Sequence, residues 1–88
     1  MRLYKDIHGD SNIESYETGA DYIWVKFKAG YTYLYNYAHT GIEHIEQMKI
    51  LAANGDGLNT FINKYVTKSY AYKKLSLVIK VELGSPVY

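Results

Sequence analysis

The sequence predicts an α+β domain in which an antiparallel three-stranded meander is followed by two amphipathic helices and a C-terminal strand. The prediction rests on how the spacing of apolar residues changes along the chain. Up to His39 apolar and polar residues alternate as in half-buried strands, beyond it they recur with the period of a helix, and near the C-terminus alternation returns. A chain of 88 residues has room for one core, so we expect a single domain over residues 1–88.

The first two strands are marked by a turn and by an alternating pattern. The first strand is expected over residues 11–17, and the turn at residues 18–21 uses the positive φ that Gly19 adopts freely. The second strand has the clearest alternation in the N-terminal half. Its apolar face holds Ile23, Val25 and Phe27, and its other face holds Tyr22, Trp24, Lys26 and Lys28.

The third strand, expected over residues 31–37, has a tyrosine at every second position, and the preceding turn decides which face these tyrosines occupy. A two-residue turn would place them beside Trp24, but it needs Ala29 at positive φ, which costs about 1–2 kcal/mol. A three-residue loop, 28–30, puts only Gly30 in the left-handed region and causes no strain. We therefore expect this loop, with the tyrosines on the apolar face of the second strand, mainly as a core layer. They are Tyr31, Tyr33, Tyr35 and Tyr37.

Two helices are expected after the strands. Thr40 and Glu43 form a capping-box pattern, so the first helix should begin at Thr40 and end at Asn54 and Gly55. Asp56 is expected to cap the second helix. The apolar stripe of the first helix is Ile42, Ile45, Met48, Leu51 and Ala52, and that of the second is Leu58, Phe61, Ile62, Tyr65 and Val66.

The C-terminal part of the chain is basic and contains a regular strand pattern. Residues 57–81 carry five lysines and no acidic residue, whereas the rest of the chain carries five basic and nine acidic residues. Such a segment attracts polyanions, although lysines also keep a helix and an edge strand in solution. Apolar residues alternate with others from Leu75 to Leu83, so we expect an additional strand over residues 75–83.

The sequence does not point to a membrane segment, a metal site or a catalytic centre. No apolar run reaches about 18 residues, so we expect no membrane association and a cytoplasmic location. The chain has no cysteine, and His8, His39 and His44 lack the spacing of a zinc-binding helix. No base, orienting partner and oxyanion site are placed together. We therefore expect a protein that is not an enzyme and that has no metal and no cofactor.

An ordered series of short motifs runs from residue 11 to residue 70. The motifs are Ser11-Asn12-Ile13, Ile23-x-Val25-x-Phe27-x-x-Gly30, Tyr33-Leu34-Tyr35, Met48-Lys49-x-Leu51-Ala52, Gly55-x-Gly57-Leu58-Asn59-x-Phe61-Ile62-Asn63, Val66 and Tyr70. In this order and spacing they resemble the KTSC domain, a module named for its occurrence at the C-terminus of some lysine tRNA synthetases and also found as a free-standing bacterial protein. The chain departs from that pattern at residues 16–18 and in the strand over 75–83, which lies beyond the module.

The resemblance carries a limited implication for function. The KTSC family is usually described as of unknown function, with RNA binding suggested from the proteins in which it occurs. Only Tyr33 and Tyr35 match its signature positions, and no catalytic role attaches to them. The resemblance therefore implies a small binding module, with RNA as its partner.

Two functions fit these observations. In the first, the protein binds RNA, with Trp24 as the exposed ring that stacks on bases and with lysines that hold phosphates. In the second, the strand from Leu75 to Leu83 pairs with another protein or with a second copy of the chain as a homodimer. We favour RNA, because the KTSC resemblance adds to the evidence of the residues. The lysines of this hypothesis are Lys26, Lys28, Lys64, Lys68, Lys73 and Lys74.

Overall fold

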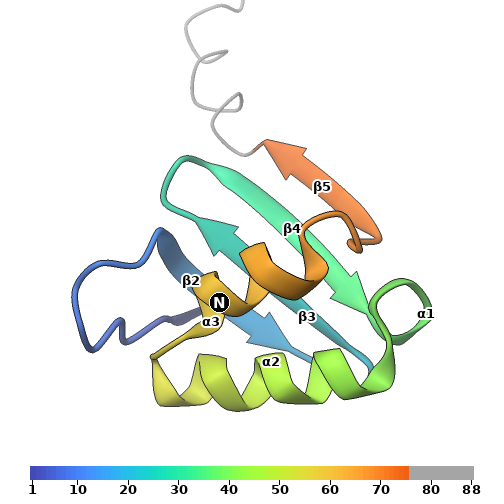
Figure 1. The fold of residues 1–88 in the computed structure, drawn as a ribbon. Helices are drawn as coiled ribbons and strands as arrows, with labels where there is room; N and C mark the ends of the chain where they lie inside the picture. The colour runs from blue at the N-terminus through green and yellow to red at the C-terminus, as the bar shows by residue number, and fades with distance from the viewer. Residues whose placement is uncertain (76–88) are drawn as a thin grey trace, which may run out of the picture.

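A computed structural model describes residues 1–75 as a five-stranded antiparallel sheet, with helices over one of its faces (Figure 1). The strands follow the chain order across the sheet, β1-β2-β3-β4-β5. The predicted mixture of helix and antiparallel sheet is thus confirmed, although several of its details differ. The strands are β1 (Arg2–Leu3), β2 (Ile13–Thr18), β3 (Tyr22–Phe27), β4 (Tyr31–Asn36) and β5 (Tyr72–Leu75), and the helices are α1 (Tyr37–Thr40), α2 (Ile42–Asn54), α3 (Leu58–Phe61) and η1 (Ile62–Val66).

The hairpin between β3 and β4 has the predicted three-residue loop. Gly30 has a φ of 107°, and its N–H donates to the carbonyl of Phe27 at 2.9 Å. No residue other than glycine in this loop has a positive φ. Val25 therefore pairs with Tyr33, which places the tyrosines on the apolar face of β3 as expected.

The sheet is wider than the predicted three-stranded meander. β1 adds a two-residue strand beside β2, and its length is too short to produce an alternating pattern. At the other edge β5 pairs with β4 and begins at Tyr72, before the expected start at Leu75. Residues 76–83 of the predicted strand lie outside the described residues.

The chain leaves the sheet one residue earlier than predicted, and the helix that follows has a different start. Tyr37 opens the short helix α1, because the side chain of Asn36 caps it by accepting the N–H of His39 at 2.9 Å. Thr40 is the last residue of α1 and donates its hydroxyl to the carbonyl of Ser69 at 2.6 Å. The predicted capping box is therefore wrong, and Gly41 stands at the N-cap of α2 without a side-chain cap.

The predicted end of α2 is confirmed. Gly55 has a φ of 73°, and its N–H donates to the carbonyls of Leu51 and Ala52. The predicted apolar stripe of α2 is confirmed at Ile45, Met48 and Ala52, which are buried, and is wrong at Ile42, which is 58% exposed.

The second predicted helix consists of two parts. Gly57, and not Asp56, stands at the N-cap of α3, and α3 continues into the π-helix η1. The hydroxyl of Thr67 donates to the carbonyls of Ile62 and Asn63. It therefore provides a hydrogen bond to carbonyls near the end of the helix, where regular helical partners are missing. Tyr65 of the predicted stripe is 53% exposed. The buried residues of this stripe are Leu58, Ile62 and Val66.

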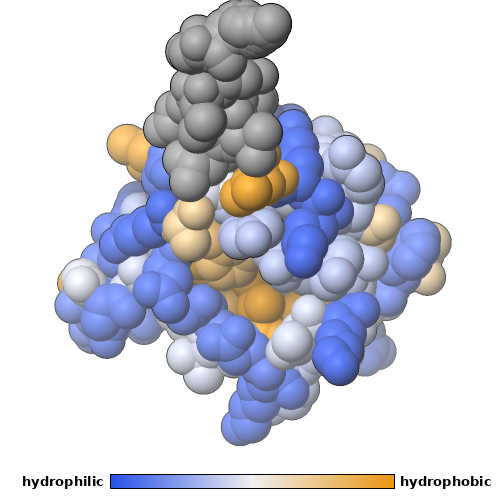
Figure 2. Space-filling model, turned by 90° about the horizontal axis from the view of Figure 1, so that it is seen from above, coloured by the Kyte–Doolittle hydropathy of each residue, from blue (hydrophilic) through white to orange (hydrophobic). Residues whose placement is uncertain are grey.

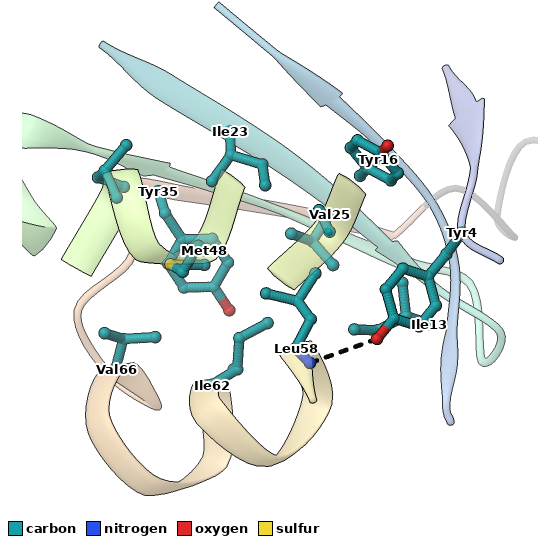
Figure 3. Close-up of a cluster of buried hydrophobic side chains, with 12 residues drawn as sticks. Tyr4, Ile13, Tyr16, Ile23, Val25, Tyr35, Met48, Leu58, Ile62 and Val66 are labelled. Atoms are coloured by element: carbon teal, nitrogen blue, oxygen red, sulfur yellow. Dashed lines mark hydrogen bonds between the residues drawn. The ribbon is translucent and has the colours of Figure 1, made fainter. Parts of the chain in front are cut away.

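The core lies between the sheet and the helices α2, α3 and η1 (Figure 3). Tyr4, from the segment after β1, extends into this core, and its hydroxyl accepts the N–H of Leu58 at 3.3 Å. This bond ties the N-terminal segment to the first turn of α3. The largest fully buried side chain is that of Tyr35.

Burial of tyrosines makes the stability of the fold sensitive to alkaline pH. Burial, together with the neighbouring Tyr33 and Tyr70, raises the pKa of Tyr35 above its ordinary value of 10.0. An unfolded tyrosine ionises near pH 10, so stabilisation by the neutral phenol is complete below that pH and is lost above it. We expect the free energy of unfolding to fall as the pH rises above about 10, and to fall less in Tyr35→Phe. Urea denaturation at several pH values measures this difference, and an equal loss in both proteins would contradict the prediction.

Candidate nucleic-acid interface

Strand β5 gives one lysine to each face of the sheet, because neighbouring side chains in a strand point to opposite faces. On the face without helices, the ammonium of Lys74 lies 5.2 Å from the ring centroid of Trp24. On the helix-covered face, the ammonium of Lys73 lies 5.3 Å from the ring centroid of Tyr31. The lysines predicted to form one site are thus divided between two surfaces.

The first surface, here called the open sheet face, holds Trp24, Lys26, Thr32, Leu34, Tyr72 and Lys74, of which Thr32 is buried at 2% exposed. No helix of residues 1–75 covers it (Figure 1). Trp24 pairs with Leu34 across β3 and β4, and Leu34 pairs with Tyr72 across β4 and β5. The rings of Trp24 and Tyr72 meet edge to face, with centroids 6.2 Å apart and an interplanar angle of 89°. Tyr72 is 54% exposed and presents more ring surface than the half-buried Trp24.

The open sheet face is close to electrically neutral. Lys26 forms an ion pair with Glu14 at 3.7 Å, and Glu17 pairs with Trp24 across β2 and β3. Lys74 has no carboxylate partner within residues 1–75. A polyanion on this face would therefore gain more from ring stacking than from net charge.

The second surface follows the tyrosines of β4, here called the tyrosine row: Tyr31, Tyr33 and Tyr35. Burial decreases along the row towards the hairpin, from Tyr35 at 1% exposed through the half-buried Tyr33 to Tyr31 at 38% exposed. The predicted core layer is confirmed at Tyr35, whereas Tyr31 lies at the surface. The ring of Tyr33 stacks on that of Tyr35 and meets the ring of Tyr70 edge to face.

Beside the tyrosine row the structure has a groove between the β3–β4 hairpin and η1, here called the tyrosine groove. It has a volume of about 420 Å³, and in Figure 2 apolar surface fills the middle of this face within a ring of hydrophilic residues. This volume lies within the range of about 300–1,000 Å³ that is common for ligand pockets. Its walls include the tyrosine row, Phe27, Lys28 and Ile62.

The remaining predicted lysines do not lie on the open sheet face. Lys28 belongs to the hairpin loop, where it lines the tyrosine groove and forms an ion pair with Asp6 at 3.5 Å. The ammonium of Lys64 lies 5.6 Å from the ring centroid of Tyr65 on η1, and Lys68 is exposed just after η1. The prediction that Lys28 stands beside Trp24 is therefore wrong.

Tyr72 was missed by the sequence analysis. Its signal is the alternation of Tyr70 and Tyr72 before Lys73 and Lys74, which becomes visible only when the strand is begun before Leu75. Among residues 1–75, no three His, Cys, Asp or Glu side chains are grouped so that they could hold a metal ion. None of the helices in the same part of the chain has the length and the apolarity to cross a membrane.

Comparisons of the chain with models of protein families, with curated proteins and with solved structures give no match.

Proposed function

We propose that this protein is a non-enzymatic module that binds single-stranded RNA on the open sheet face. The observation that carries the proposal is the pair of rings, Trp24 and Tyr72, with Lys26 and Lys74 in the neighbouring row of a sheet face that no helix of the described residues covers. Aromatic side chains on the free face of an antiparallel sheet are a common platform for unstacked RNA bases. The resemblance to the KTSC domain supports the same partner.

The arrangement suggests how binding proceeds. A base stacks on Trp24 or Tyr72, and each stacked base contributes about 1–3 kcal/mol. Lys74 now rests over the ring of Trp24, and the flexible side chain can move to a phosphate when a base takes its place. Because Lys26 already has a carboxylate partner, few phosphates are neutralised, and the dependence of binding on salt should be small.

The first test uses the single tryptophan of the chain as its probe. Stacking of a base on Trp24 should quench its fluorescence during titration with oligouridylate. Trp24→Ala, followed by anisotropy of a labelled oligonucleotide, should weaken binding about 5- to 150-fold, which corresponds to the loss of one stacked base. Lys74→Gln should reduce the slope of log affinity against log salt by about 0.7.

The matched control is Lys64→Gln combined with Lys68→Gln, which removes two exposed charges from the segment around η1. We expect this double variant to bind as the unchanged protein does. If it loses binding while Trp24→Ala retains it, the site lies at η1 and the proposal for the open sheet face is wrong. The protein-interaction hypothesis stays a prediction, because its strand falls mostly beyond the described residues.

A further inference from the structure

The side chain of Tyr35 lines the tyrosine groove, and its hydroxyl is not sealed from solvent. Tyr35 is 1% exposed, and its hydroxyl forms no hydrogen bond within residues 1–75, although the residue lines the groove. Figure 3 shows this hydroxyl at the end of a ring that extends from β4 towards the side of Ile62. Among residues 1–75 no buried polar side-chain atom lacks a hydrogen-bond partner, so solvent in the groove reaches this hydroxyl, and a ligand there can bond to it.

The walls of the groove define the shape and polarity of such a ligand. Phe27, Tyr33 and Ile62 give apolar and aromatic surfaces, which suit a flat ring. Asn12 and Asn63 also line the groove, and their amides form no side-chain hydrogen bond within the described part of the chain. The π-helix contributes Asn63, and π-turns are frequent at functional sites.

The mouth of the groove favours an anion. Among the residues of the range 1–75 that line the groove, Lys28 is the one with a charge and none is a carboxylate. The ammonium of Lys28 lies 3.5 Å from Asp6, but the lysine side chain remains 55% exposed, so a second anion can reach it.

From these observations we propose that the tyrosine groove binds a nucleoside 5′-monophosphate, either free or as the 5′-terminal nucleotide of an RNA chain. The base lies between the rings and Ile62, its edge accepts a hydrogen bond from Tyr35, the amides of Asn12 and Asn63 contact the base or ribose, and Lys28 holds the phosphate. An alkyl chain would leave the hydroxyl of Tyr35 unpaired, and a sugar alone would leave the aromatic walls uncovered. This site lies on the opposite face of the sheet from Trp24 and does not depend on the proposed RNA platform.

The state of Tyr35 supports this role. Burial raises the pKa of its phenol, so the hydroxyl stays protonated and can donate at neutral pH. Every nucleobase presents ring nitrogens or carbonyl oxygens as acceptors at its edge. The hydrogen bond can therefore form with any of the bases, and selection among them would rest on the amides of Asn12 and Asn63.

The experiment is a calorimetric and NMR titration with uridine, adenosine, cytidine and guanosine 5′-monophosphates, with ribose 5-phosphate as the probe that lacks a base. We expect at least one nucleotide to bind and to shift the amide signals of Lys28, Gly30 and Asn63, while the indole signal of Trp24 stays unchanged. Tyr35→Phe removes one oxygen atom and should weaken binding about 2- to 12-fold, as the loss of one hydrogen bond predicts. Tyr65→Phe, which removes a hydroxyl from an exposed ring outside the groove, should leave it unchanged.

The outcomes separate the two sources of the ligand. If a 5′-phosphorylated oligonucleotide binds more tightly than the free nucleotide, and Tyr35→Phe weakens both by the same factor, the ligand is the end of an RNA chain. If the oligonucleotide and the free nucleotide bind with equal affinity, the ligand is the free nucleotide. The proposal would be overturned if ribose 5-phosphate bound as tightly as the nucleotides. It would also be overturned if neither Tyr35→Phe nor Lys28→Gln weakened nucleotide binding. No binding of any nucleotide would also overturn it. An oligonucleotide without a 5′-phosphate tests the open sheet face separately through Trp24→Ala.

Discussion

Replacement of Tyr35 by alanine should lower the free energy of unfolding by about 3–5 kcal/mol, the range for truncation of a large buried aromatic side chain. Tyr35 is the largest fully buried side chain, and it lies between β4 and the helices in the centre of the core. A cavity of this size cannot close, because Ile23 and Val25 on the sheet and Ile62 on η1 are held by their own elements. Urea denaturation followed by far-ultraviolet circular dichroism measures the change.

The tyrosine row provides its own controls for this prediction. Tyr33→Ala should have an intermediate effect, since its ring packs on Phe27, Tyr35 and Tyr70 but remains half-buried. Tyr31→Ala should have the smallest effect of the three, because that side chain is 38% exposed. A loss of stability at Tyr31 as large as that at Tyr35 would mean that the order of burial along β4 is wrong.

The second large effect is expected at Gly55, where a methyl group has no room. Gly55 has a φ of +73°, and an added Cβ would lie 2.5 Å from the Cβ of Lys5 and 3.2 Å from the backbone nitrogen of Asp6. Gly55 also accepts the N–H of Ile7 at 2.9 Å, so the N-terminal segment rests directly on the end of α2. Gly55→Ala should therefore lower the free energy of unfolding by about 2–5 kcal/mol, from backbone strain and displacement of this segment together.

Gly9 is a matched control for that substitution. It has the same φ of +73°, but an added Cβ would meet no atom within 4 Å. Gly9→Ala should therefore show the backbone strain alone, about 1–2 kcal/mol. Thermal and urea denaturation of both variants gives the comparison, and equal losses would show that the contact with Lys5 has no energetic weight.

Some features that depend on local strain could be predicted from the sequence, although the expected positive φ at Gly19 is wrong. The prediction of the three-residue β3–β4 loop is confirmed. It rested on the different cost of a positive φ at Ala29 and Gly30, and this difference does not depend on the rest of the fold. The same holds for the end of α2 at Gly55. The face of the tyrosine row follows from that loop, since a slip of one residue would have reversed it.

Features that depend on distant parts of the chain could not be predicted. Thr40 looks like a helix cap, but its hydroxyl donates to Ser69, 29 residues further along the chain. β1 exists because Arg2 and Leu3 pair with β2, although two residues carry no periodic signal. In the π-helix η1 the carbonyls of Ile62 and Asn63 accept the hydroxyl of Thr67, which appears in the sequence as an ordinary polar residue after the helix.

The candidate sites show the same division. Trp24 and Lys26 could be assigned to one face from the alternation in β3 alone. Lys73 and Lys74 could not be separated, because the strand was expected to begin at Leu75, after both lysines, whereas β5 begins at Tyr72. The tyrosine groove could not be found from the sequence, since Phe27 and Ile62 are brought together by the packing of η1 on the sheet and were both expected in a closed core.

The order of the strands has a consequence for synthesis on the ribosome. Residues 1–36 contain β1 to β4, which are neighbours in both the chain and the sheet, so this part can pair through short loops as soon as it emerges. The helices that cover its apolar face emerge later, and η1 is complete only at Val66. Between these two lengths the nascent chain exposes Ile23, Val25 and Tyr35, and we expect it to bind chaperones at this stage. β5 then joins last, and it brings Lys73 and Lys74 to their opposite faces only after the core has closed.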